Sequence, residues 1–233
     1  MVVYPTVEIL YQDEFIVAVN KPANMIVHPG QGGNYEKFSV MKLVKHQIGK
    51  WVYPIHRLDR PTSGVLLLGL NKEFTSKLMQ NWSNTKKFYY ALICGDYKVH
   101  GEFKFALKDR NKVNRDTGEI SDIFKESHTL YWPIDQLEGV ESKYTLCNVE
   151  TRTGRMHQIR RHFARCVTPL VGDTKYGKAK FNNELRDNYE VRRLFLHCHT
   201  VGFVHPSTDE EIVIECELSP ELKESLKLMK LKI

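Results

Sequence analysis

Residues 53–70 read YPIHRLDRPTSGVLLLGL, a crowded polar turn that leads directly into an apolar run. A short, continuous apolar run bounded by turn residues is typical of a buried strand, and we expect one over 65–70. Pro61 fixes its own φ and restricts the residue before it, and Gly64 permits a backbone conformation that a side chain would forbid. The turn is therefore expected to hold Asp59 rigidly at the entrance to a buried strand.

The charges around Asp59 favour a chemical role for its carboxylate. Arg57 and Arg60 lie close to it in the sequence, and opposite charges nearby favour the ionised form. An ionised carboxylate held in one place suits a nucleophile or a base. No second carboxylate lies close in the sequence, so the pair of acids used in glycoside hydrolysis is not indicated. The residues alone leave open a structural turn in which Asp59 bonds to its own backbone.

A second unusual stretch is 151–166, TRTGRMHQIRRHFARC, which has five arginines, two histidines and no acid up to residue 165. It predicts a helix over 156–167 with an apolar stripe on one side and, opposite, a basic face of the kind that phosphate backbones select. Arg160 falls at the border, where its guanidinium can turn inward to a buried carboxylate. The alternative, a solvated helix face, fits the outer arginines better than Arg160. The stripe consists of Ile159, Phe163 and Cys166, and the basic face of His157, Arg161 and Arg165.

The segment 86–95, KKFYYALICG, reads as a strand in which Lys87 and Tyr89 share one face and Phe88 and Tyr90 the other. A tyrosine beside a basic residue can stack on an unpaired RNA base. A tyrosine in a strand is also frequently a plain core residue. The segment alone leaves both interpretations open.

Histidines invite a comparison with metal sites, chiefly in LHCHTVGFVHP over 196–206. His197 and His199 share a strand face, with Cys198 between them and His205 further on, but no fourth ligand has a recognisable spacing. The chain also lacks both standard glycine-rich phosphate loops. We therefore predict no metal and no nucleotide cofactor.

The composition of the chain is that of a globular protein. Of its 233 residues, 42% are hydrophobic and 27% charged, which are ordinary values. It has no run of about 18 apolar residues that would cross a membrane, and its N-terminus lacks the pattern of a secretory signal. The five cysteines form no C-x-x-C pair, which favours reduced thiols in a cytoplasmic protein. The net charge of +6 favours an anionic partner.

The remaining patterns predict one α+β domain with a largely antiparallel sheet, because helices and strands alternate without a repeat or a break in composition. VEILYQDEFIVAVNKP over 7–22 is expected to form a hairpin, and the charged segment 104–127 a loop or excursion. Four helices are expected: one that Ser39 caps and Gly49 ends, one that begins at Asn71 with Phe74, Leu78 and Trp82 on one stripe, and two over 156–167 and 219–231. The further strands are expected over 87–95, 143–150, 192–199 and 211–217.

Taken in their order along the chain, the motifs resemble those of one known family. HRLDRPTSG resembles the signature of the RluA-type pseudouridine synthases, and the other matching segments follow in the family's order along nearly the whole chain. One departure is Asn24, which stands in KPANMIVHPG where the family usually has glycine; asparagine is the next residue most tolerant of a left-handed backbone. The other matching segments are ILYQDEFIVAVNKP, KKFYYALICG, TGRMHQIRRHFA, PLVGDTKYG and RLFLHCHTVGFVHPSTDEE.

The resemblance implies the pseudouridine synthase fold, an α+β fold whose mixed, largely antiparallel sheet is bisected by a central active-site cleft. It implies one catalytic domain over 1–233 without an S4 RNA-binding domain. It also implies an isomerase that converts a specific uridine in structured RNA to pseudouridine without cofactor or metal. The implied partner is RNA, with tRNA as the substrate, and we expect a cytoplasmic monomer that binds neither membrane nor DNA.

Carried over residue by residue, the resemblance makes Asp59 the catalytic carboxylate and Arg57 the arginine that enters the RNA where the target base leaves. Tyr89 matches the tyrosine that contacts the base, Ile159 the apolar residue packed at the base, and Arg160 the basic residue that pairs with the aspartate. The basic segment is expected to contact the RNA backbone through Arg155, Arg161 and Arg165.

Two other functions stay open on the sequence: a pseudouridine synthase acting on rRNA, and a non-catalytic RNA-binding or folding factor that uses the same surface. The intact HRLD motif with Tyr89 and Arg160 favours an enzyme, because a binding protein has no need of a buried carboxylate. Attack on the base, attack on the sugar and proton abstraction are all compatible with an ionised Asp59.

Overall fold

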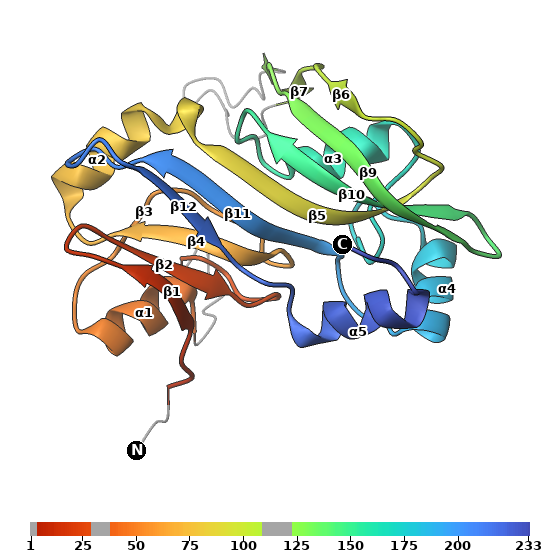
Figure 1. Ribbon diagram of the computed structural model, residues 1–233, viewed down its shortest axis with the longest axis horizontal. Coiled ribbons are helices and arrows are strands. Elements are labelled where there is room, and N and C mark those ends of the chain that lie inside the picture. The colour runs from red at the N-terminus through yellow and green to blue at the C-terminus, as the bar shows by residue number, and fades with distance from the viewer. Residues whose placement is uncertain (1–3, 29–37, 109–122) are drawn as a thin grey trace, which may run out of the picture.

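The computed structural model describes residues 4–28, 38–108 and 123–233, and a long mixed sheet runs through all three ranges (Figure 1). Its strands are β1 (Glu8–Gln12), β2 (Ile16–Lys21), β3 (Tyr53–Pro54), β4 (Ser63–Gly69), β5 (Lys86–Cys94), β6 (Gly101–Phe103), β9 (Thr129–Glu138), β10 (Lys143–Thr151), β11 (Leu196–Val204) and β12 (Glu211–Glu215). They pair in the order β1-β2-β4-β11-β5-β10-β9-β6, with β3 added to β4 and β12 to β11. The expected mixed, largely antiparallel sheet is confirmed.

Helices pack against this sheet around two hydrophobic clusters. Helices α1 (Val40–Ile48), α2 (Lys72–Gln80) and α3 (Gln158–Arg165) belong to the larger cluster, and α4 (Ala179–Tyr189) and α5 (Pro220–Met229) to the smaller one. In the smaller cluster, helix residues such as Leu185 and Leu222 pack with Leu92 of β5 and Tyr144 of β10, and the two helices lie side by side at one end of the sheet (Figure 1). No helix in the described ranges is long and apolar enough to cross a bilayer.

A parallel contact in the middle of the sheet positions the turn of Asp59. β4 runs parallel to β11 through the pairs Ser63–His197 and Gly64–Cys198. Gly64 has a φ of +109°, and a Cβ atom there would lie 2.1 Å from the carbonyl oxygen of Cys198. Glycine is needed because no side chain fits between these backbones, as the sequence led us to expect. The turn thereby lies at the junction between the β1-β2-β4 part of the sheet and the remainder.

Several local predictions are confirmed by the backbone. The hairpin of β1 and β2 is antiparallel. Helix α1 follows Ser39, whose hydroxyl accepts a hydrogen bond from the N–H of Lys42, and it ends at Gly49 with a φ of +68°. The side chain of Asn71 caps α2. Asn24 has a φ of +63°, the left-handed conformation expected for an asparagine in place of glycine.

The predicted bounds of β11 and α2 are wrong. The strand expected over 192–199 starts at Leu196 and continues to Val204, because the preceding residues bond outside the ladder, as Phe195 does when it donates to Val171. Trp82 does not extend the stripe of α2, since the helix ends at Gln80 and Trp82 opens the 3₁₀ turn η1 (Trp82–Asn84).

Strand β9 and helix α4 have no counterpart among the sequence predictions. β9 contains Pro133, a residue that argues against a strand inside a sheet. In the structure Pro133 lies beside a register shift between Leu146 and Cys147 of β10, where a bulge accommodates it. The charged segment 104–127 leaves the sheet, as expected, and its ends pair as β7 (Leu107–Lys108) and β8 (Phe124–Lys125); residues 109–122 lie outside the described ranges.

Candidate active site

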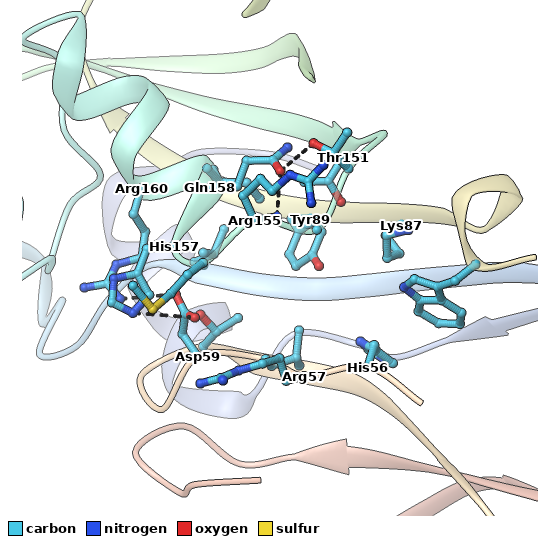
Figure 2. A pocket seen from close by; sticks show the side chains of 18 of the residues that line it. His56, Arg57, Asp59, Lys87, Tyr89, Thr151, Arg155, His157, Gln158 and Arg160 are labelled. Atoms are coloured by element: carbon cyan, nitrogen blue, oxygen red, sulfur yellow. Dashed lines mark hydrogen bonds and ion pairs between the residues drawn. The ribbon is translucent and has the colours of Figure 1, made fainter. Parts of the chain in front are cut away.

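A pocket of about 400 Å³ lies at this junction, between the turn of Asp59, strand β5 and the start of α3 (Figure 2). Most of the predicted site residues line it, although they come from three separate parts of the chain. Arg161 and Arg165 instead line a hollow on the outer side of α3. The predicted residues that line the pocket are Arg57, Asp59, Tyr89, Arg155, Ile159 and Arg160.

A buried lysine, Lys21, anchors the turn that carries Asp59. The Thr62 N–H donates to the Asp59 carbonyl at 3.1 Å and closes the turn. The ammonium of Lys21, at the end of β2, is fully buried and donates to the carbonyls of Pro22, Met25 and Arg60 at 2.8, 2.7 and 3.1 Å. Burial lowers the pKa of Lys21 to about 7. Lys21 therefore ties the loop after β2 to the turn, a contact that the sequence analysis did not predict.

The carboxylate of Asp59 is contacted by Arg160 of α3 and by His157, the residue before that helix. Arg160 Nη1 lies 3.2 Å from Asp59 Oδ2, and His157 Nε2 lies 3.8 Å from Asp59 Oδ1. We expected Arg57 and Arg60 to flank the carboxylate, but within the described ranges neither arginine contacts it. Arg57 is exposed at the pocket mouth (Figure 2), and Arg60 Nε donates to the carbonyl of Asn24 at 3.1 Å. Although both arginines are close to Asp59 in the sequence, the turn directs their side chains away from its carboxylate.

Arg160 joins Asp59 to a second, fully buried aspartate. Its Nε and Nη2 atoms donate to the two carboxylate oxygens of Asp173 at 2.7 and 2.8 Å. Burial opposes the charge of Arg160, but the hydrogen bonds and charges of Asp173 and Asp59 raise its pKa. Asp173 also accepts the N–H groups of Lys175 and Tyr176. The sequence analysis missed Asp173, although it lies in the PLVGDTKYG motif as the acid that follows the basic helix.

His157 is turned into the pocket by an unusual backbone conformation. It precedes α3 with a φ of +53°, and its Nδ1 lies 2.9 Å from the hydroxyl of Tyr176. The prediction that His157 shares a basic outer face with Arg161 and Arg165 is therefore wrong, because the helix begins at Gln158 rather than at Met156. Burial lowers the pKa of His157 against the pull of Asp59.

Tyr89 and Ile159 form apolar walls of the pocket. Tyr89 faces it from β5 and is 8% exposed, and Ile159 faces it from α3 and is 5% exposed. Burial raises the pKa of Tyr89 well above its usual value, so its hydroxyl keeps its proton at neutral pH. Apolar walls of this kind can hold a planar ring.

The predicted RNA-contacting arginines lie beside the pocket and along α3. Arg155 is exposed and its Nε donates to the carbonyl of Glu126 at 3.0 Å. Arg161 donates to the carbonyl of Lys108 at 3.0 Å, and exposed Arg165 lies over the ring of Phe105. Cys166, expected in the apolar stripe, is exposed at the end of α3, because the last helical turn ends before it can face the core.

The histidines of the C-terminal part of the chain each have separate partners. His197 bonds to Ser63 at 2.9 Å and to the carbonyl of Cys216 at 3.2 Å. His199 bonds to Asn148 and lies stacked on a tyrosine ring, and His205 is 3.4 Å from an aspartate of the β1–β2 turn. Within the described ranges, no group of three or more His, Cys, Asp or Glu side chains is arranged to hold a metal ion.

Comparison with known proteins gives consistent matches along the chain. A family model described as RNA pseudouridylate synthase matches residues 15–165. The chain is 40% identical over 221 residues to tRNA pseudouridine synthase C of Vibrio vulnificus (strain CMCP6), which covers 91% of this chain and 90% of the relative. It is 35% identical over 229 residues to tRNA pseudouridine synthase C of Salmonella typhimurium, which covers 94% and 88%.

Two solved structures have a similar fold. Human RNA Pseudouridylate Synthase Domain Containing 4 matches with a TM-score of 0.72 at 22% identity, over 97% of this chain and 94% of that chain. Human RNA Pseudouridylate Synthase Domain Containing 1 matches with a TM-score of 0.71 at 21% identity, over 92% and 84%. At these identities the similarity concerns the fold alone.

Proposed function

This chain belongs to the RNA pseudouridylate synthase family, and on that premise we propose that it isomerises a specific uridine of tRNA to pseudouridine, with Asp59 as the catalytic carboxylate. The observation that carries the proposal is the recessed carboxylate of Asp59, held by Arg160 and His157 in a pocket with an apolar wall. The tRNA substrate is proposed because relatives that match over about nine-tenths of the chain are named for tRNA.

The reaction requires three changes in one pocket. The bond between N1 of uracil and C1′ of ribose must break, the base must turn over, and C5 must bond to C1′ while C5 loses a proton and N1 gains one. A carboxylate that bonds transiently to the substrate or removes a proton from it accelerates such a sequence. Arg160, paired with Asp173 behind it, keeps the Asp59 carboxylate oriented after RNA has displaced water from the pocket.

The position of Arg57 supports a role in displacing the target base. A uridine can reach Asp59 only after it leaves the RNA stack, which costs roughly a few kcal/mol. Arg57 extends from the same turn at the pocket mouth (Figure 2). We assign it to the space that the flipped base vacates, where its guanidinium can stack and bond to the neighbouring nucleotides. Tyr89 and Ile159 then bracket the uracil.

The basic residues around α3 support a docking surface for the RNA backbone. With the exposed Arg155 and Arg165 as contacts, a surface that neutralises about five phosphates gives a slope of log K against log salt near −4 to −5. We expect Arg155→Ala combined with Arg165→Ala to reduce the slope by about 2. The matched control is Arg186→Ala, which removes an exposed arginine of α4. An unchanged slope in the double variant would place the docking surface elsewhere.

The proposed function is tested by mapping pseudouridine. Unmodified tRNA transcripts and rRNA fragments are incubated with the purified chain, and pseudouridine is located by chemical labelling and primer extension. We expect one position in tRNA to be modified without added metal or cofactor. Modification confined to rRNA would show that the substrate is rRNA rather than tRNA. Binding of tRNA without any pseudouridine would favour a non-catalytic RNA-binding factor.

A further inference from the structure

Two buried lysines lie near the pocket, and their hydrogen bonds differ. Lys21 uses all three of its N–H donors on backbone carbonyls. Lys87, on β5, is 5% exposed, and the hydrogen bond that the structure gives its ammonium is one to the carbonyl of Thr85 at 2.9 Å. An ammonium group carries three donors. Lys87 thus has the capacity for two more hydrogen bonds, and unlike Lys21 it lines the pocket.

The ammonium of Lys87 lies over an aromatic ring, and the charge of Glu150 acts on it without a direct ion pair. Its Nζ lies 5.1 Å from the ring centroid of Trp82, and Trp82 is stacked on His56 at 5.0 Å. His56 Nε2 accepts the N–H of Leu67, and burial, with the charge of Lys87, lowers the pKa of His56 to about 3. Among the described residues no carboxylate lies within ion-pairing distance of Lys87. Burial lowers the pKa of Lys87 to about 8, so the group is mainly protonated at pH 7.

The position of Lys87 on its strand places it beside the base-binding wall. Lys87 and Tyr89 are two residues apart on the same face of β5, which corresponds to a separation of about 6.6 Å along the strand. Figure 2 shows the two side chains along one edge of the pocket, with Asp59 across from them. A ring placed against Tyr89 therefore has an edge within reach of the Lys87 ammonium.

We propose that Lys87 is a further substrate-contacting residue, whose ammonium donates a hydrogen bond to a carbonyl oxygen of the flipped uracil. The proposal rests on the proposed function. A uracil carbonyl is favoured over a phosphate because Lys87 is a buried lining residue of the pocket, whereas the exposed Arg57 and Arg155 lie where a phosphate backbone would stay hydrated.

The test compares one RNA in two forms: the tRNA stem-loop with its modified position occupied by uridine, and the same stem-loop with an abasic site there. Binding is measured in the Asp59→Asn background, so that no turnover occurs. Lys87→Met keeps the length of the side chain and removes its donors. We expect it to weaken binding of the uridine form about 10-fold or more, the usual effect of one hydrogen bond to a charged group, and to leave binding of the abasic form unchanged.

Lys86→Met is the matched control, because Lys86 is the adjacent lysine of the same strand, with a side chain that is 59% exposed near Glu211. We expect it to bind both forms like the parent. The melting temperature of Lys87→Met should stay within about 4 °C of the parent, since the lost bond to Thr85 is offset by removing a buried charge. If Lys87→Met does not fold, Lys87→Leu serves, because it also lacks a donor, and the same loss is expected on the uridine form alone.

Three results would overturn the proposal. Equal binding by the Lys87 variant and the parent on both forms would make Lys87 a structural residue. An equal loss on both forms with a shallower salt dependence would mean a phosphate contact. A loss by Lys86→Met as large as that by Lys87→Met would mean a general charge effect. If the parent protein makes no pseudouridine in any RNA, the failure lies in the proposed function instead.

Discussion

Replacement of Asp59 by asparagine is expected to abolish pseudouridine formation while tRNA affinity stays within a few-fold of the parent value. The variant keeps the shape of the side chain but loses the charge that bonds to the substrate or removes its proton. Losses of more than about 10³-fold are usual when such a group is neutralised. We expect binding to survive because the proposed docking surface consists of arginines around the pocket mouth and α3. Single-turnover conversion and equilibrium binding of the same tRNA separate the two effects.

The matched control for this experiment is Asp187→Asn, which neutralises an exposed aspartate of α4 far from the pocket in sequence. It should leave both conversion and binding unchanged. If Asp59→Asn still produced pseudouridine at a rate near that of the parent, Asp59 would not be the catalytic carboxylate, and the buried pair behind it would need another explanation.

The second large effect concerns stability. Arg160→Ala is expected to lower the free energy of unfolding by about 3–5 kcal/mol, because it leaves the fully buried carboxylate of Asp173 without its cation. The same change should lower activity, since Asp59 loses the guanidinium that orients it. Urea denaturation measures the first effect and single-turnover conversion the second. The control Arg192→Ala removes an arginine from an exposed pair with Glu190, which should change stability by less than about 1 kcal/mol.

Double-mutant cycles show which aspartate dominates the pairing. Arg160 makes two short bonds to buried Asp173 and one bond of 3.2 Å to Asp59, whose side chain is 16% exposed. The coupling free energy with Asp173→Ala should therefore reach about 2 kcal/mol, and that with Asp59→Ala should stay below about 1 kcal/mol. Additive losses in the cycle with Asp173 would contradict the buried pair. A larger coupling with Asp59 would mean that Asp59 is the main partner.

Much of the fold follows from local chemistry that is visible in the sequence. Ser39 and Gly49 delimit α1, and Asn71 begins α2, because capping depends on residues within one turn of the helix. Gly64 marks a backbone contact that admits no side chain. β9 is different, because its proline and its half-buried faces give weak local signals. It becomes a strand by pairing with β10, with a bulge in β9 itself at Ile134, next to Pro133.

The sequence also named most of the residues that line the pocket, since the family resemblance assigned the turn around Asp59, the strand of Tyr89 and the helix of Arg160 to one site. It did not determine the partners of these residues. Arg57 and Arg60 are near Asp59 in the chain, yet its carboxylate contacts His157 and pairs with Arg160, about a hundred positions away. Hydrogen bonds between distant segments depend on how strands register and where a helix begins, and His157 reaches Asp59 only because α3 starts one residue after it.

The two buried lysines show the same limit. In the sequence, Lys21 and Lys87 are both lysines of apolar strands. In the structure, the loop after β2 and the turn of Asp59 satisfy Lys21 with three carbonyls, whereas the floor of the pocket leaves Lys87 with one. Periodicity and capping act over a few residues and can be read locally, but the number of acceptors around a buried charge is set by segments that meet only after folding. The sequence determined most of the elements and singled out Asp59, and the tertiary structure decided how many hydrogen-bond partners each buried charge has.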